Sequence, residues 1–211
     1  MCRGWGHFML WAGKFFCGID YVIEGTEHIP DEASVVMIKH SSVFETYAQL
    51  VTFPPQTWVL KRELHWIPLF GWGLALMKPI AINRKAGRRA VTQVIEQGKQ
   101  RLAEGIWLSV FPEGTRMPPG ETKKYGISGA ALAVATGCPI VPVAHNAGDL
   151  WPRHSFWKRP GLVRFCIGPP IGPAGRPPKE VNLEVQAWIE AKMLEISSVY
   201  QERAARSDVE V

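Results

Sequence analysis

Short apolar runs alternate along the chain with segments whose apolar residues recur at helical spacing. The runs are bounded by Gly, Pro or polar residues and predict strands at 19–24, 35–39, 58–60, 80–83, 106–111, 140–144 and 163–167. Strands that alternate with helices are typical of an α/β domain. The pattern therefore predicts a single α/β domain whose central sheet is largely parallel or mixed and flanked by helices.

Three segments carry the helical pattern. In the first, the apolar residues end just before Gly105, which is expected to terminate the helix: Ala90, Val91, Val94, Ile95 and Leu102. The uncharged stretch 125–148 is divided by Gly and Pro, so it predicts a helix over about 127–136 and then a buried strand rather than a membrane span. A long C-terminal helix is predicted over about 179–203, with one apolar stripe: Val181, Val185, Trp188, Ile189, Met193, Ile196 and Tyr200.

The N-terminal residues 1–18 form a short amphipathic segment rich in aromatic side chains. Its apolar run is shorter than the roughly 20 residues that a spanning helix needs, and it lacks a small-residue cleavage site. Two interpretations stay open, a first helix packed on the core and a helix lying on a membrane surface. Residues 19–211 are predicted to form the one remaining domain.

Composition narrows the possible partners without naming one. The chain has 211 residues, 46% of them hydrophobic and 20% charged, which excludes a disordered chain. A net charge of +5 favours anionic partners, and nine Trp residues only hint at a membrane. The four Cys residues show no CxxC spacing, so neither a disulfide framework nor a metal site is predicted.

The first candidate chemistry lies at the end of the strand 35–39. His40 follows this strand, and Glu45 comes five residues later, in the first turn of a predicted helix. A carboxylate can hold an imidazole in one tautomer and leave its other nitrogen to act as a general base. The Ser42-x-x-Glu45 spacing also fits a helix capping box, so Glu45 could instead satisfy backbone donors. Both interpretations stay open on the residues alone.

Three further blocks follow in order at strand ends or in loops. Arg84 follows the strand 80–83, the run Phe-Pro-Glu-Gly-Thr-Arg occupies 111–116, and Pro142 lies within the apolar strand 140–144. Strand ends and loops are where α/β sheets expose functional groups. The six-residue run at 111–116, placed after the segment with His40 and Glu45, is very improbable by chance.

Over roughly residues 15–170 the chain resembles the glycerolipid acyltransferase family typified by 1-acyl-sn-glycerol-3-phosphate acyltransferase. Its four ordered blocks are matched by His40 with Glu45, by Arg84, by 111–116 and by Pro142. Two departures stand out. The family's usual acid in the first block is Asp, and its N-terminal hydrophobic helix is represented here only by the short aromatic segment.

The resemblance implies transfer of a fatty acyl group from a thioester, acyl-CoA or acyl carrier protein, to 1-acyl-sn-glycerol-3-phosphate, giving phosphatidic acid. His40 is expected to deprotonate the acceptor hydroxyl while Glu45 orients it, with no cofactor beyond the acyl donor. No GxSxG motif and no Cys in a recognised nucleophile motif is present, which favours direct attack over an acyl-enzyme. Ser41 or Ser42 as nucleophile is the weaker alternative, because helix capping explains both.

The remaining block residues are expected to bind substrate. Arg84 is the main candidate for the acceptor phosphate, with Arg116 as a second cation, because guanidinium matches phosphate oxygens. Glu113, Gly114 and Thr115 would complete a tight turn against the substrate, although Glu113 could instead pair with a neighbouring Arg. Pro142 would shape the acyl pocket or simply the core.

The expected partners are a lysophospholipid, an acyl thioester and the anionic surface of a membrane at its cytoplasmic face. Lys85, Arg88 and Arg89 are expected to be solvated or to attract anionic lipid or an acidic carrier protein. No nucleic-acid motif is present. Alternatives are a different lysolipid acceptor such as a lyso-ornithine lipid, hydrolysis with water as acceptor, and a non-catalytic basic protein that binds membranes.

Overall fold

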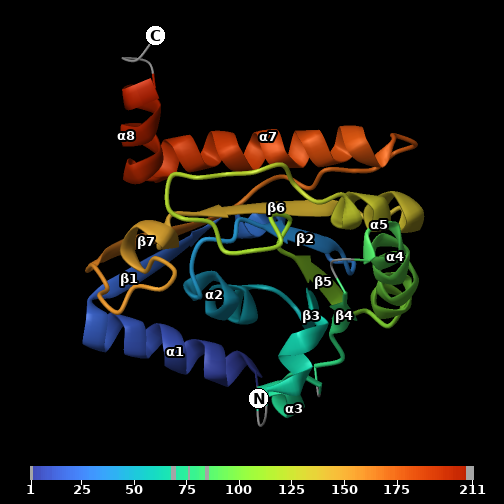
Figure 1. The fold of residues 1–211 in the computed structure, drawn as a ribbon, viewed down its shortest axis with the longest axis horizontal. Helices are drawn as coiled ribbons and strands as arrows, with labels where there is room; N and C mark the ends of the chain where they lie inside the picture. The colour runs from blue at the N-terminus through green and yellow to red at the C-terminus, as the bar shows by residue number, and fades with distance from the viewer. Residues whose placement is uncertain (1, 68–69, 76, 84–85, 208–211) are drawn as a thin grey trace.

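The structure, a computed structural model, describes residues 2–67, 70–75, 77–83 and 86–207 (Figure 1). Its centre is a sheet with the strand order β1-β7-β6-β2-β5-β3-β4. The strands are β1 (Ile19–Glu24), β2 (Val35–Ile38), β3 (Gln56–Lys61), β4 (Ile80–Ile82), β5 (Trp107–Val110), β6 (Ile140–His145) and β7 (Gly161–Ile167). Each predicted strand is present, within two residues at either end.

The sheet is mixed. Strands β6, β2, β5, β3 and β4 run parallel to one another, whereas β7 is antiparallel to β6 and parallel to β1. The carboxyl ends of β6, β2 and β5 therefore lie side by side at one edge of the sheet, which is where α/β folds place their sites.

Helices cover both faces of the sheet. In Figure 1, α7 runs along one side of the sheet and α1 along the other, with α2 between α1 and the strands. The α-helices are α1 (Cys2–Cys17), α2 (Phe44–Thr52), α3 (Phe70–Ala75), α4 (Arg88–Ala103), α5 (Ser128–Thr136), α6 (Ala147–Leu150), α7 (Pro178–Ile196) and α8 (Ser198–Ser207). The 3₁₀ segments η1 (Thr26–His28) and η2 (Arg62–Trp66) lie in the connections.

Two cores result from the alternation of side chains along the buried strands. In β2, Val35 and Met37 join the core under α4, α5 and α7, while Val36 and Ile38 join the core under α1, α2 and α6. All four β2 side chains are buried, as expected for a strand covered on both faces. The predicted fold class, a single α/β domain with a mixed sheet, is confirmed.

The single C-terminal helix predicted over 179–203 is wrong, because the chain forms two helices that meet at Ser197. Ser197 has extended backbone angles, φ −107° and ψ 118°, which end α7. Its hydroxyl accepts the N–H of Tyr200 at 3.2 Å, caps α8 and donates to the carboxylate of Asp149 at 2.9 Å. A hydroxyl at this position stabilises a new helix start, so the apolar stripe continues across a bend.

Helix α1 combines features of both interpretations of the N-terminal segment. Leu10 is 2% exposed and packs into the core under α2, and Arg3 donates to the carbonyl oxygen of Val51 at 2.9 Å. The opposite side exposes aromatic side chains to half or more of their surface: Trp5, Phe8, Trp11, Phe15 and Phe16. Among the described residues, no helix is both long enough and apolar enough to cross a bilayer.

Candidate active site

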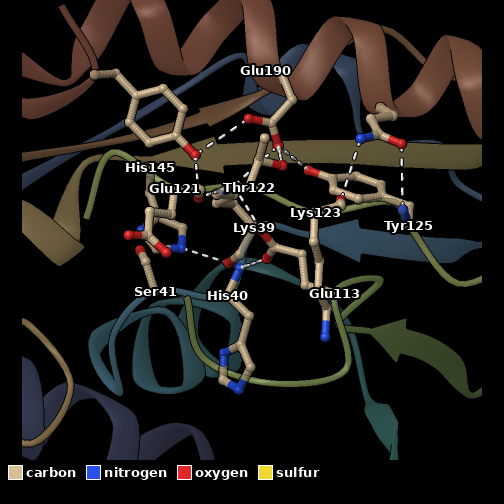
Figure 2. Close-up of polar contacts among 12 residues, drawn as sticks. Lys39, His40, Ser41, Glu113, Glu121, Thr122, Lys123, Tyr125, His145 and Glu190 are labelled. Atoms are coloured by element: carbon tan, nitrogen blue, oxygen red, sulfur yellow. Dashed lines mark hydrogen bonds and ion pairs between the residues drawn. The ribbon is translucent and has the colours of Figure 1, made fainter. Parts of the chain in front are cut away.

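Lys39 and His40 continue the alternation of β2 beyond the last strand residue. Lys39 follows the series Val35, Met37 and lies on the α7 side, whereas His40 follows Val36, Ile38 and lies on the α2 side. Figure 2 shows the His40 imidazole pointing away from the polar cluster around Lys39. The two faces of the strand end thus carry two separate sets of polar contacts.

On the α2 side, His40 and Glu45 form a hydrogen-bonded pair. His40 Nδ1 lies 2.8 Å from Glu45 Oε1, and the same oxygen accepts the backbone N–H groups of Ser41 at 3.2 Å and Ser42 at 3.1 Å. Glu45 therefore orients the imidazole and satisfies backbone donors at the start of α2, so the two interpretations of Glu45 are compatible. Ser42 Oγ accepts the N–H of Phe44 at 3.2 Å, which is a capping role.

The His40 imidazole is fixed by its neighbours but remains accessible to solvent. The His40 side chain is 18% exposed, while that of Glu45 is fully buried. The ring of Phe111, at the end of β5, stacks on the His40 ring with centroids 4.0 Å apart. Because Nδ1 faces the carboxylate, Nε2 is the nitrogen left to accept a proton.

Electrostatics keep Glu45 ionised despite its burial. Burial alone would raise the pKa of Glu45, but the interactions with His145 and His40 outweigh it and hold the pKa below its usual value. His145 is also buried, and burial lowers the pKa of its imidazole. An ionised carboxylate hydrogen-bonded to the imidazole is the arrangement that a His–Glu base requires.

On the α7 side, a buried lysine joins two carboxylates from distant parts of the chain (Figure 2). Lys39 Nζ lies 2.6 Å from Glu113 Oε1 and 3.0 Å from Glu190 Oε1, and the Lys39 side chain is fully buried. Glu113 Oε2 in turn accepts the backbone N–H of His40 at 2.8 Å. Burial raises the pKa of Glu113, although Lys39 opposes that shift. Among the residues that the structure describes, Glu113 thus contacts the backbone and a Lys, not an Arg.

Glu190 of α7 is the centre of this cluster. Its carboxylate accepts the hydroxyls of Thr122 at 2.8 Å, Tyr125 at 2.7 Å and Tyr200 at 3.2 Å. Burial and the neighbouring carboxylates raise the pKa of both Tyr hydroxyls, so they remain donors. These contacts tie the segment after β5 to the C-terminal helices.

The segment after β5 turns sharply next to His40. Gly114 has φ +65°, a left-handed value that glycine adopts without strain, and its N–H donates to Phe111 at 2.9 Å. Met117 N–H donates to the carbonyl of His40 at 2.7 Å, which places exposed Thr115 and half-buried Arg116 beside the His40 backbone. The Arg153 guanidinium donates to the carbonyl oxygen of Arg116. No carboxylate of the described residues pairs with the Arg116 guanidinium.

Two predicted substrate residues have no described contact at this site. Arg84 lies outside the described residues, as does Lys85. Pro142 is buried within β6, and alternation with Val141 and Val143 turns it toward the face opposite His40. The substrate roles of both residues stay predictions, and the position of Pro142 gives its role no support.

Sequence reasoning did not identify Lys39, Glu190 or His145 as parts of the site. A lysine at an inward position of an apolar strand is a signal, because a buried ammonium needs carboxylate partners. Its partner Glu190, however, lies 151 residues away. In the described ranges, no group of three or more His, Cys, Asp or Glu side chains is placed to hold a metal ion.

Comparisons with known proteins place the chain in a family. The family model described as "Acyltransferase" matches residues 20–146. A 1-acyl-sn-glycerol-3-phosphate acyltransferase of Pseudomonas aeruginosa is 42% identical over 202 residues, which cover 94% of this chain and 79% of that protein. The alpha form from Mus musculus is 27% identical over 177 residues, 82% of this chain, and the chain spans 62% of that relative.

A solved structure agrees with this result. The crystal structure of the 1-acyl-sn-glycerophosphate (LPA) acyltransferase PlsC from Thermotoga maritima has a TM-score of 0.76 and 27% sequence identity. The match covers 92% of this chain and 77% of the other. The family model covers more than half of this chain, and the Pseudomonas relative is similar along nearly all of it. The chain therefore belongs to the acyltransferase family.

Proposed function

We propose that this protein transfers a fatty acyl group from a thioester to the free hydroxyl of 1-acyl-sn-glycerol-3-phosphate, which gives phosphatidic acid. The observation that carries the proposal is the His40–Glu45 pair at 2.8 Å, with an accessible imidazole at the carboxyl end of β2. The names of the relatives in the acyltransferase family support the choice of substrate.

In this mechanism His40 Nε2 takes the proton of the acceptor hydroxyl, while the Nδ1–H group keeps its proton and stays hydrogen-bonded to Glu45. The acceptor oxygen attacks the thioester carbonyl and forms the ester bond, and the C–S bond breaks to release a thiolate. The proton on Nε2 then passes to the thiolate. Glu45 stabilises the transient imidazolium, since an adjacent carboxylate favours the charged ring.

The phosphate of the acceptor would bind Arg116. This residue directly precedes Met117, whose backbone N–H donates to the carbonyl oxygen of His40. The Arg116 guanidinium is suited to phosphate oxygens, and the Arg153 guanidinium donates to the backbone carbonyl oxygen of Arg116. Arg84 stays a predicted second ligand, and its replacement by Ala is expected to raise the KM for the acceptor.

The donor in this proposal is acyl-CoA or an acylated carrier protein, both of which carry negative charge. Lys123 and Lys124 are exposed on the segment that follows Arg116. Figure 2 shows the Lys123 side chain extending toward the side on which the His40 imidazole lies. Such cations attract phosphate groups through long-range electrostatics, so they suit either donor.

The acceptor is a lipid, and α1 offers a surface for peripheral docking on the cytoplasmic face of a membrane. Its exposed residues Trp5, Phe8, Trp11 and Phe15 form one ridge in which neighbouring ring centroids are 5.4–6.0 Å apart. Trp and Phe side chains on one face of a helix bind the boundary between headgroups and acyl chains. We expect Trp11→Glu with Phe15→Glu to abolish flotation with vesicles of anionic phospholipid, whereas Leu183→Glu, which alters an exposed residue of α7, leaves it unchanged.

The experiment that tests the proposed reaction supplies the purified protein with labelled acyl-CoA and a panel of acceptors. Phosphatidic acid is the product expected from 1-acyl-sn-glycerol-3-phosphate. Free fatty acid without phosphatidic acid would instead indicate hydrolysis, and acylation of another lysolipid alone would contradict the proposed acceptor.

A further inference from the structure

A second histidine lies behind the His40–Glu45 pair. His145 ends β6, and alternation with Val141 and Val143 turns it to the same face of the sheet as His40. Its side chain is fully buried, and its Nε2 lies 2.7 Å from the carbonyl oxygen of Lys39 and 3.7 Å from Glu45 Oε2. Figure 2 shows His145 directed at this carbonyl.

The hydrogen bonds of His145 define its tautomer. The backbone N–H of Ala147 donates to Nδ1 at 3.3 Å, so Nδ1 is an acceptor and Nε2 carries the proton. The Nε2–H group therefore donates to Lys39, and its positive end also faces Glu45. The ring lies parallel to that of Phe165, with centroids 6.1 Å apart, which limits its rotation.

The two oxygens of Glu45 are in different situations. Oε1 receives the three donors from His40, Ser41 and Ser42. Oε2 is buried, and in the part of the chain that the structure describes it has no hydrogen-bond partner. A buried carboxylate oxygen without a full hydrogen bond is costly, so the dipole of His145 next to it matters for the ionised state.

We propose that His145 is a positioning residue of the active site, which fixes the Lys39–His40 backbone through the Lys39 carbonyl and supports the second oxygen of Glu45 with its Nε2–H. The inference rests on the proposed function of His40 as the base. His145 touches no reacting atom and acts through its two neighbours.

The charged groups around this pair give the sign of the expected effect. Glu45 of α2 faces His40 and His145, and Lys39 lies on the other side of the strand end, paired with Glu113 and Glu190. Without the Nε2–H dipole, the negative charge on Glu45 is less compensated and favours a protonated His40. The acid limb of the kcat/KM profile, which reports the free base, should therefore move to higher pH.

Two substitutions separate this role from packing. In His145→Asn the amide oxygen can replace Nδ1 as acceptor for Ala147, but the side chain is too short to reach Lys39. In His145→Gln the amide nitrogen can replace Nε2 as donor. Both variants are polar and similar in size, so they are matched for the cost of burial.

The test measures kcat, KM and the pH profile of lysophosphatidate acylation for the wild type and both variants, with thermal unfolding as the check on folding. We expect His145→Asn to lower kcat about tenfold or more, with KM changed less than about twofold and the acid limb moved up by about half a unit. His145→Gln should restore kcat to within about threefold of the wild type, with the limb at its original position.

Equal loss in both variants with an unmoved acid limb would overturn the inference, because packing alone would then explain it. If His145→Asn does not fold, the test rests on His145→Gln. A tenfold loss of kcat in that variant would also overturn the inference. Failure of the proposed function is recognised separately, because the wild type would then form no phosphatidic acid, or His40→Ala would retain turnover.

Discussion

Lys39 and His40 are neighbours in sequence, yet their side chains pair with carboxylates on opposite faces of the sheet. Lys39 Nζ lies 2.6 Å from Glu113 Oε1, and His40 Nδ1 lies 2.8 Å from Glu45 Oε1. Strand alternation thus separates a buried structural cluster from an accessible base. Glu113 joins the two, because it accepts the backbone N–H of His40 as well as pairing with Lys39.

Glu45→Gln should lower kcat by about 100-fold or more, because the amide cannot hold the imidazole proton as a carboxylate does. The amide oxygen can still accept the N–H groups of Ser41 and Ser42, so we expect the free energy of unfolding to fall by only about 1 kcal/mol. Steady-state kinetics and urea unfolding measure the two effects. A loss of stability with wild-type kcat would mean that Glu45 only caps α2.

Lys39→Met should destabilise the fold by about 3–5 kcal/mol, because it leaves the buried Glu113 and the partly buried Glu190 without their cation. Urea unfolding at neutral pH measures this change. Lys192→Met is the matched control, since Lys192 pairs with Glu195 near the surface of the same α7. A surface pair contributes less than about 1 kcal/mol, so equal effects of the two substitutions would contradict the importance of the buried cluster.

The stability of the wild type should fall as the pH drops below about 6.5, the ordinary pKa of His, because burial lowers the pKa of His145. The unfolded chain then binds a proton that the folded chain does not, which costs up to about 1.4 kcal/mol per pH unit. His145→Gln should remove this part of the slope. Urea unfolding of both proteins between pH 7.5 and about 5 tests it, and parallel curves would show that His145 stays unshifted.

Arg116→Ala should raise the KM for lysophosphatidate about tenfold or more and change kcat much less, since it removes a ligand of a non-reacting group. The control is Arg89→Ala, an exposed cation of α4 that lies outside the segment next to His40. Steady-state kinetics with varied acceptor concentration measures both. An unchanged KM for Arg116→Ala would remove this residue from the phosphate site.

The sequence predicts well what is local. Apolar runs give the strands, and five residues of spacing bring His40 and Glu45 together because a helix begins directly between them. Long-range pairs are different. Nothing in the sequence near Lys39 points to Glu190, and the bend at Ser197 depends on Asp149, which lies 48 residues earlier. These contacts follow from how the helices pack on the sheet, which periodicity does not specify.

The most direct test of the account is acyl transfer by His40→Ala with lysophosphatidate and labelled acyl-CoA. His28→Gln is the control, because η1 follows β1, whose carboxyl end lies at the opposite edge of the sheet. We expect a folded His40→Ala protein whose formation of phosphatidic acid falls at least about 1000-fold, with near wild-type formation by His28→Gln. Turnover by folded His40→Ala close to that of the wild type would contradict this expectation.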